Sequence, residues 1–155
     1  MRTSELLALI HKDQNNKYCA DCGSFNPRWV SINIGCVICI ECSGIHRSLG
    51  SHISSVRSIG LDDWTPEMIE YIKNRGNTVV NKEYEATLPP NFKRPSSSDT
   101  NNITKFITQK YVYKNFYTPL DKSSKTEIAS TDSAQSSIEQ PQMSPAIKLL
   151  DSLIN

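Results

Sequence analysis

Four cysteines form two pairs whose spacing suits the binding of one metal ion. Each pair has the pattern Cys-x2-Cys, and sixteen residues separate the pairs. The expected ligands are Cys19, Cys22, Cys39 and Cys42. This arrangement is typical of a zinc site, because each pair forms a tight turn that presents two sulfurs to the same ion. The alternatives are two disulfides or four ordinary buried cysteines, and random placement rarely produces such spacing.

A zinc ion held by four thiolates has a structural role, because no coordination position remains for water or substrate. We therefore expect one structural Zn²⁺, which in sites of this kind contributes roughly 10–16 kcal/mol to folding. Any chemistry must come from a residue that the ion holds in place. Arg47 is the best candidate, because it follows Cys42 by five residues on a predicted helix. The alternative is an ordinary arginine on a solvated surface.

Tryptophan, histidine and a fifth cysteine also occur near the metal pattern. Trp29 is either functional or a large side chain packed beside the zinc site. His46 and His52 resemble further ligands, but four sulfurs already complete the site, so structural histidines are expected. Cys36 falls outside the metal spacing, and we expect it to be a small buried hydrophobic residue.

Hydrophobic periodicity predicts short elements around this site. We expect helices at about 4–12 (capped by Thr3 or Ser4), 40–50, 65–76, 77–84 (capped by Asn77) and 100–116, and strands at 30–34, 36–39 and 55–61. The first two strands form a β-hairpin, with Val30, Ile32 and Ile34 facing inward. On the 40–50 helix Cys42 and Ile45 face inward, whereas Arg47 lies about 140° around the helix from Cys42. The predicted fold is α+β, a small zinc-finger domain with a short central antiparallel sheet flanked by helices.

The composition suggests one domain followed by a tail. The 155 residues fit a zinc domain at 1–118 and a Ser/Thr-rich, disordered tail at 119–155. Residues 145–154 have a small apolar face that suits either a short helix or a frayed terminus. The net charge is +1, and the tail's −2 leaves +3 for residues 1–120, a mildly basic domain.

Composition also bounds the compartment and the partners. Free thiolates persist in reducing compartments, so a cytoplasmic protein is expected. There is no run of about 18 apolar residues, so we expect no membrane span. A zinc-finger nucleic-acid binder would need a helix rich in Lys and Arg. Residues 40–50 offer only Arg47 beside Glu41, so no nucleic-acid partner is expected.

Longer motifs surround the two cysteine pairs. They are Cys19–Cys22, Asn26–Trp29, Ile38–Gly50, His52–Ser54, Val56–Ser58, Leu61–Asp62 with Trp64, Tyr84–Pro89, and the helix that ends at Lys110 and Tyr111. Together they resemble the GTPase-activating domain for Arf-type small GTPases. The resemblance covers about residues 4–117, and the later segments are most similar to the small stromal-membrane-associated branch of that family.

The resemblance implies a mechanism and partners. Arg47 would be an arginine finger that accelerates GTP hydrolysis by a GTP-bound Arf-family GTPase, so the protein would have no independent active site. Trp29 and Ile45 would form the platform for the finger, and Trp29 would also contact the GTPase. A role in vesicle trafficking is also implied, with peripheral membrane contact and transient recruitment from the cytoplasm to Golgi, endosomal or plasma membranes. The tail could bind a coat or adaptor protein. The remaining alternative is a catalytically inactive scaffold of the same family.

Overall fold

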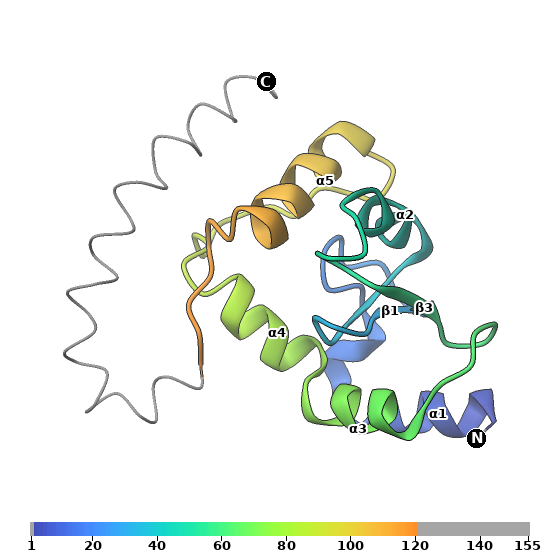
Figure 1. Ribbon diagram of the computed structural model, residues 1–155. Helices are drawn as coiled ribbons and strands as arrows, with labels where there is room; N and C mark the ends of the chain where they lie inside the picture. The colour runs from blue at the N-terminus through green and yellow to red at the C-terminus, as the bar shows by residue number, and fades with distance from the viewer. Residues whose placement is uncertain (1, 121–155) are drawn as a thin grey trace.

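The computed structural model describes residues 2–120, which form short helices around a small sheet (Figure 1). The expected disorder beyond residue 120 and the helix at 145–154 lie outside the described residues. The α-helices are α1 (Thr3–Ile10), α2 (Ile40–Ser48), α3 (Pro66–Asn74), α4 (Gly76–Tyr84) and α5 (Thr100–Ile107). The strands are β1 (Trp29–Ser31), β2 (Cys36–Ile38) and β3 (Val56–Ser58). A 3₁₀-helix, η1 (Gln14–Lys17), and a π-helical turn, η2 (Thr108–Val112), complete the set.

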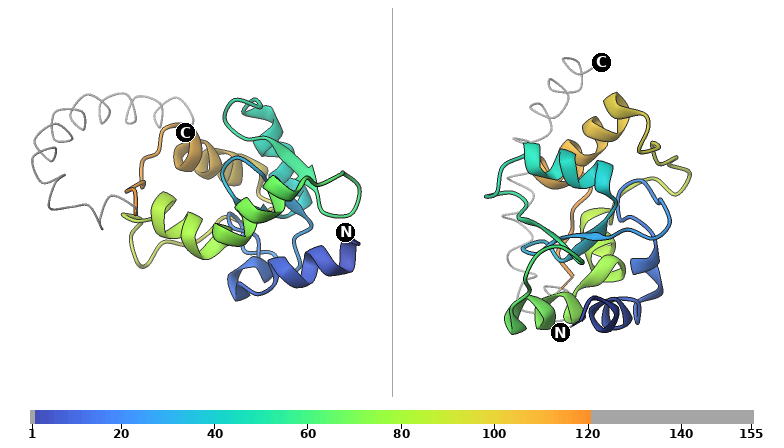
Figure 2. Two further views of the ribbon diagram at one scale, coloured as in Figure 1. Left: turned by 60° about the horizontal axis from the view of Figure 1, so that its bottom comes forward. Right: turned by 90° about the vertical axis from the view of Figure 1, so that its right-hand side faces the viewer.

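The sheet is antiparallel with strand order β2-β1-β3, so the predicted α+β fold and the β1–β2 hairpin are confirmed. Val30 pairs with Val37 on one side and with Arg57 on the other. The sheet lies between α1 and α3 on one face and α2 and α5 on the other (Figures 1 and 2). Three-residue strands form few ladder hydrogen bonds, so packing on both faces must hold this sheet in place.

Each face of the hairpin contributes to a different apolar cluster. Val30 and Val37 are fully buried with Leu6 and Ile72, from α1 and α3. Ile38 instead packs in the cluster that contains the metal-spaced cysteines and α5. The alternation follows from the two-residue period of a strand, whose successive side chains point to opposite faces.

The expectation of a five-residue strand with Val30, Ile32 and Ile34 on one face was wrong. β1 ends at Ser31, and residues 32–35 form the hairpin turn. Ile34 is buried in the cysteine cluster, away from Val30. Gly35 completes the turn with a φ of +98°, a conformation that L side chains rarely adopt.

Several element ends differ from the prediction for local reasons. α1 starts after Arg2, whose backbone N–H donates to the Glu5 carboxylate, so neither Thr3 nor Ser4 caps it. β3 stops at Ser58, where the backbone N–H donates to Asp62. The predicted 100–116 helix is α-helical only to Ile107 and then widens into η2. Thr65 caps α3, because its hydroxyl accepts from the backbone N–H of Met68.

Asn77 was expected to cap α4, but it lies inside the first turn of that helix. Its buried side chain accepts from the backbone N–H of Val37 (2.7 Å) and donates to the carbonyl oxygens of Tyr18 (2.7 Å) and Val37 (3.1 Å). Asn77 thus satisfies the outer edge of β2 and joins it to η1. The helix start is capped from far away instead, because Asp13 accepts the backbone N–H of Thr78.

Replacing Asn77 with alanine should lower the free energy of unfolding by about 2–4 kcal/mol, because the buried N–H of Val37 and carbonyl of Tyr18 would lose their partner. Denaturant unfolding of the metal-saturated protein measures this. Asn74→Ala is the matched control, since Asn74 is exposed on α3 and its change should stay within about 0.5 kcal/mol. Equal effects at the two positions would contradict the proposed role of Asn77.

Candidate metal centre and exposed arginine

The four metal-spaced cysteines converge on one point. Their sulfur atoms all lie within 4.8 Å of one another, and the Cys22 and Cys39 sulfurs are 3.6 Å apart. Tetrahedral coordination with zinc–sulfur bonds of about 2.3 Å requires sulfur–sulfur distances of about 3.8 Å. All five cysteines of the chain are free thiols, so the alternative of two disulfides is not adopted. The donor set therefore fits a metal ion held by four sulfurs.

Backbone groups orient the sulfurs toward this point. The N–H of Asp21 donates to the Cys19 sulfur, and the N–H of Cys42 donates to the Cys39 sulfur, both at 3.4 Å. Cys39 is also the N-cap residue of α2, where the helix dipole favours a negative sulfur. These contacts stabilise thiolates, which are the form that binds metal.

The sulfurs strongly perturb one another. Burial raises the pKa of Cys19, and the sulfurs of Cys19, Cys22 and Cys39 raise the pKa of Cys42. The same close contacts lower the pKa of Cys22. All four thiols can ionise together only when a cation balances their charge, which is what a bound metal ion would supply.

Cys36 behaves as predicted for a buried cysteine outside the site. Its side chain is completely buried, and burial raises its pKa to about 12. The hydroxyl of Tyr111 points to its sulfur at 3.7 Å. Cys36 therefore stays a neutral thiol at physiological pH, in contrast to a metal ligand.

α2 carries Arg47 away from the sulfurs. The helix begins directly after Cys39, and Cys42 is fully buried while Arg47 is exposed. The guanidinium carbon of Arg47 lies 5.0 Å from the ring centroid of Trp29 on β1. Within residues 2–120, no carboxylate lies within ion-pair distance of Arg47. The guanidinium is thus held on an aromatic face but keeps its hydrogen-bond donors available.

Trp29 contacts Arg47, and Ile45 lies two residues before it on the same helix. Both are half-buried and pack against the apolar cluster that contains the cysteines. The structure therefore brings Trp29 and Arg47 together, and it places Ile45 on the inner side of the helix. Both interpretations of Trp29 are compatible with this placement, because the ring packs beside the metal site and also contacts the arginine.

His46 is a structural residue, which agrees with the sequence-based expectation. It is fully buried; its Nε2 lies 2.8 Å from Asp21 and its Nδ1 lies 2.8 Å from the hydroxyl of Ser54. Ser54 in turn contacts the hydroxyl of Ser31 on β1 at 2.7 Å. His46 thus joins α2 to the first cysteine turn and to the sheet, one residue before Arg47. His52 is exposed and does not belong to the sulfur cluster.

Sequence reasoning missed a buried ionic network around Asp21. This carboxylate accepts from the ammonium of Lys110 (2.9 Å) and the hydroxyl of Tyr111 (2.6 Å), both on η2. Lys110 also donates to Glu85 at 2.7 Å and to the carbonyl of Ala20 at 2.9 Å. Asp21 and Lys110 are both completely buried. The partners are 89 residues apart in the chain, so no local pattern could have indicated the contact.

Mutual attraction keeps the pair charged despite its burial. Burial by itself would raise the pKa of Asp21, but Lys110 and the hydrogen bond from His46 outweigh it and hold this pKa well below its usual range. Burial would likewise lower the pKa of Lys110, yet Asp21 and Glu85 raise it. The network fixes the first cysteine turn against the C-terminal part of the domain.

Arg94 strengthens the same region from the loop between α4 and α5. It donates to the backbone carbonyls of Ala20 (3.2 Å) and Asp21 (3.1 Å) and pairs with Glu85 at 2.8 Å. Side chains from two distant segments, Lys110 on η2 and Arg94, thus donate to backbone carbonyls of the first cysteine turn.

Comparison with known sequences now identifies the family. The sequence model described as "Putative GTPase activating protein for Arf" matches residues 4–120. The chain belongs to the ArfGap family. The family resemblance seen in the sequence motifs is thereby confirmed.

None of the helices described between residues 2 and 120 is both long and apolar enough to span a membrane.

Curated relatives of this ArfGap chain include the branch expected from its motifs. Mouse stromal membrane-associated protein 1 is 49% identical over 112 residues, which is 72% of this chain and 25% of the relative. The human protein of that name is 43% identical over 145 residues, 92% of this chain and 30% of the relative. ADP-ribosylation factor GTPase-activating protein effector protein 2 of Saccharomyces cerevisiae is 44% identical over 110 residues, which is 70% of this chain and 37% of the relative. The chain thus spans well under half of these relatives.

Solved ArfGap domains share the fold. The ArfGap domain of human RIP is 26% identical with a TM-score of 0.70, over 77% of this chain and 89% of that domain. The ArfGap domain of HIV-1 Rev binding protein is 24% identical with a TM-score of 0.68, over 79% and 95% of the two chains. At that identity the second likeness supports the fold alone.

The metal site predicts a sharp difference between two cysteine substitutions. Cys42→Ser should reduce bound metal from one ion per chain to nearly none, because three thiolates and a hydroxyl bind zinc far more weakly. Cys36→Ala should keep the full metal content, since Cys36 lies outside the sulfur cluster. Native mass spectrometry with elemental analysis measures both the number and the identity of the ion. Metal loss from Cys36→Ala alone would contradict the assignment.

Lys110→Met should lower the free energy of unfolding by about 3–5 kcal/mol, because the buried Asp21 carboxylate would lose its cation, whereas Glu85 would keep only Arg94. The control is Lys82→Met on α4, where the lysine is exposed and the change should stay within about 0.5 kcal/mol. Thermal or urea unfolding with saturating metal measures both. A Lys110→Met protein as stable as the control would rule out the network as a major support.

Proposed function

We propose that this protein activates GTP hydrolysis by Arf-family small GTPases, with Arg47 as an arginine finger supplied in trans. One observation carries the proposal. The exposed Arg47 lies on α2, which starts directly after Cys39 and contains Cys42, and its guanidinium packs over the ring of Trp29. Membership of the ArfGap family supports the partner class.

The proposed chemistry depends on the charge that develops during phosphoryl transfer. In the transition state, negative charge spreads over the oxygens of the γ-phosphoryl group. A planar and permanently charged guanidinium can bind two of these oxygens at once, which a lysine ammonium cannot do. Fingers supplied in trans raise the rate by about 10³–10⁵. The GTPase would provide the nucleotide site, so the activator needs no active site of its own.

Trp29 would prepare the finger for this role. A guanidinium over an indole ring gains about 0.5–1 kcal/mol at an exposed site. That is enough to restrict the side chain before binding, but small enough to be exchanged for contacts to the phosphates. Ile45 would help by fixing the inner face of α2 against the apolar cluster. We therefore assign both residues to the platform of the finger.

The ion in the sulfur cluster would have an indirect role, and the donor set favours Zn²⁺ as its identity. Its four ligands would leave no open position, so it would act as a rigid link between the first cysteine turn and the start of α2. Arg47 lies less than two turns beyond Cys42, so that link would set the position of the finger.

The cellular role follows from the same proposal. We propose that residues 1–118 form the activating domain and residues 119–155 the tail, through which a coat or adaptor protein could bind. The protein would act in vesicle-mediated transport, moving from the cytoplasm to the Golgi, endosomal or plasma membranes that carry GTP-bound Arf.

Single-turnover GTP hydrolysis by a panel of Arf-family GTPases on liposomes tests the function. The wild type should accelerate at least one GTPase, and Arg47→Lys should lose roughly several hundred-fold of that acceleration or more. Trp29→Ala should fall between the two. Arg2→Lys is the control, since Arg2 is exposed and pairs with Glu5 on α1, so it should retain full activity.

Metal content and folding must match across these variants. If a folded and metal-loaded wild type accelerated no GTPase of the panel, the protein would instead be an inactive scaffold of the family. If Arg47→Lys retained most of the activity, the protein would be an activator without a finger at this position.

A further inference from the structure

Two aromatic rings project into solvent beside the first cysteine pair. Tyr18 is 50% exposed and Phe25 is 72% exposed, and their ring centroids are 5.6 Å apart. Adjacent exposed aromatic side chains of this size typically mark an interaction surface, because leaving them in water forfeits the free energy of burial.

The backbone holds the two rings in a fixed position. Tyr18 and Phe25 form an antiparallel bridge, and the backbone N–H of Asn26 donates to the carbonyl of Lys17 at 2.8 Å. The N–H of Cys19 donates to the carbonyl of Ser24, also at 2.8 Å. Residues 18–25 therefore form a small loop that is closed by hydrogen bonds and contains Cys19 and Cys22. A surface fixed in this way loses little conformational entropy on binding.

The rings form one wall of a shallow hollow whose charge is positive. Seven residues line it, among them His11 and Lys17, and none is acidic. Arg28 is at its rim, where its side chain donates to Asn26. Within residues 2–120, neither Lys17 nor Arg28 forms an ion pair with a carboxylate. Burial lowers the pKa of His11, and the charges of Lys17 and Arg28 lower it further, because both cations lie near its imidazole.

We propose that this aromatic–basic patch, defined as Lys17, Tyr18, Phe25 and Arg28, docks the domain on an anionic lipid bilayer. Aromatic rings favour the level of the lipid headgroups, and each lysine or arginine near an anionic surface adds about 1 kcal/mol. The rings project from the surface instead of lining a deep groove, which suits a bilayer better than a bound peptide. Two cations are few for a channel that follows a nucleic-acid backbone.

The inference deepens the membrane contact of the proposed function and names the surface that makes it. Phe25 precedes Trp29 by four residues, so this chain spans at most about 14 Å. A docked patch would therefore hold the Arg47 platform close to the bilayer, where a membrane-bound GTPase is found.

Vesicle co-sedimentation of the full chain tests the patch. The wild type should bind vesicles of phosphatidylcholine with about 30% phosphatidylserine, and added salt should weaken this binding. Vesicles of phosphatidylcholine alone should bind far less. Phe25→Ser should reduce the partition coefficient about tenfold, and Lys17→Glu at least about fivefold. Phe25→Trp should restore binding, because the ring is retained.

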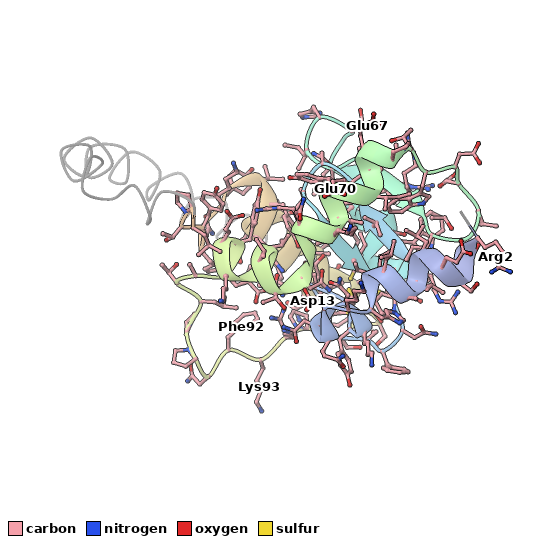
Figure 3. All side chains as sticks on the ribbon, turned by 90° about the horizontal axis from the view of Figure 1, so that it is seen from below. Arg2, Asp13, Glu67, Glu70, Phe92 and Lys93 are labelled. Carbon is pink, nitrogen blue, oxygen red and sulfur yellow. The ribbon has the colours of Figure 1, made fainter. Side chains whose placement is uncertain are left out.

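Two control variants carry the same changes outside the patch. Leu61→Ser removes an 84% exposed side chain from the loop after β3, and Lys93→Glu reverses an exposed lysine. Figure 3 shows Lys93 at the edge of the lower face, whereas Asp13, which lies between His11 and Lys17 in the chain, is near its middle. Both controls should bind anionic vesicles as the wild type does. Equal losses in the controls and in the patch variants would overturn the assignment.

Two further assays show whether the aromatic–basic patch binds lipid, the GTPase or RNA. GTP hydrolysis is measured in parallel with a soluble, membrane-free form of the GTPase, where the patch variants should keep wild-type activity. Slower hydrolysis there would make the patch a GTPase contact and overturn lipid docking. No binding of the wild type to anionic vesicles would overturn it as well, and patch-dependent binding of a single-stranded RNA oligonucleotide would then assign the surface to nucleic acid. Vesicle binding needs no GTP hydrolysis, so it can succeed or fail independently of the proposed function.

Discussion

Four cysteine sulfurs that lie within 4.8 Å of one another cannot all be thiolates unless a cation balances their charge. This constraint governs the rest of the domain, because the sulfurs come from two segments that β1 and β2 separate. Holding them together fixes the start of α2 against the first cysteine turn. β1 and β2, which lie between the two segments, have three residues each and are too short to impose that arrangement themselves.

A buried ionic network provides a second support for the same turn. Asp21 lies between two of the sulfur ligands and meets Lys110 from η2 and His46 from α2. Burying a charged pair yields little net stability by itself, but breaking one is costly. The network therefore constrains the position of η2 relative to the first cysteine turn. Because His46 precedes Arg47 on α2, the same contacts help to orient the helix that carries Arg47.

The two surfaces proposed to act outside the domain both extend from this rigid centre. Arg47 stands on the helix that the sulfurs anchor, and its side chain rests on Trp29. The ring pair of Tyr18 and Phe25 brackets the first two sulfurs. Neither surface needs a flexible loop to form. A domain of this kind suits an activator that must present one guanidinium to a partner's nucleotide while its own orientation is fixed.

The sequence by itself determined the four cysteines of the candidate metal centre, the hairpin between them, the helix that carries Arg47 and the family, because each depends on residues close together in the chain. Fixed cysteine spacing and helical periodicity are local signals. Only the tertiary structure decided the role of Asn77 and the network around Asp21. In both cases the deciding partner is distant in sequence: Asn77 satisfies the edge of β2, and Asp21 binds Lys110. Buried polar groups must find partners wherever the fold places them, and a one-dimensional pattern does not contain those distances.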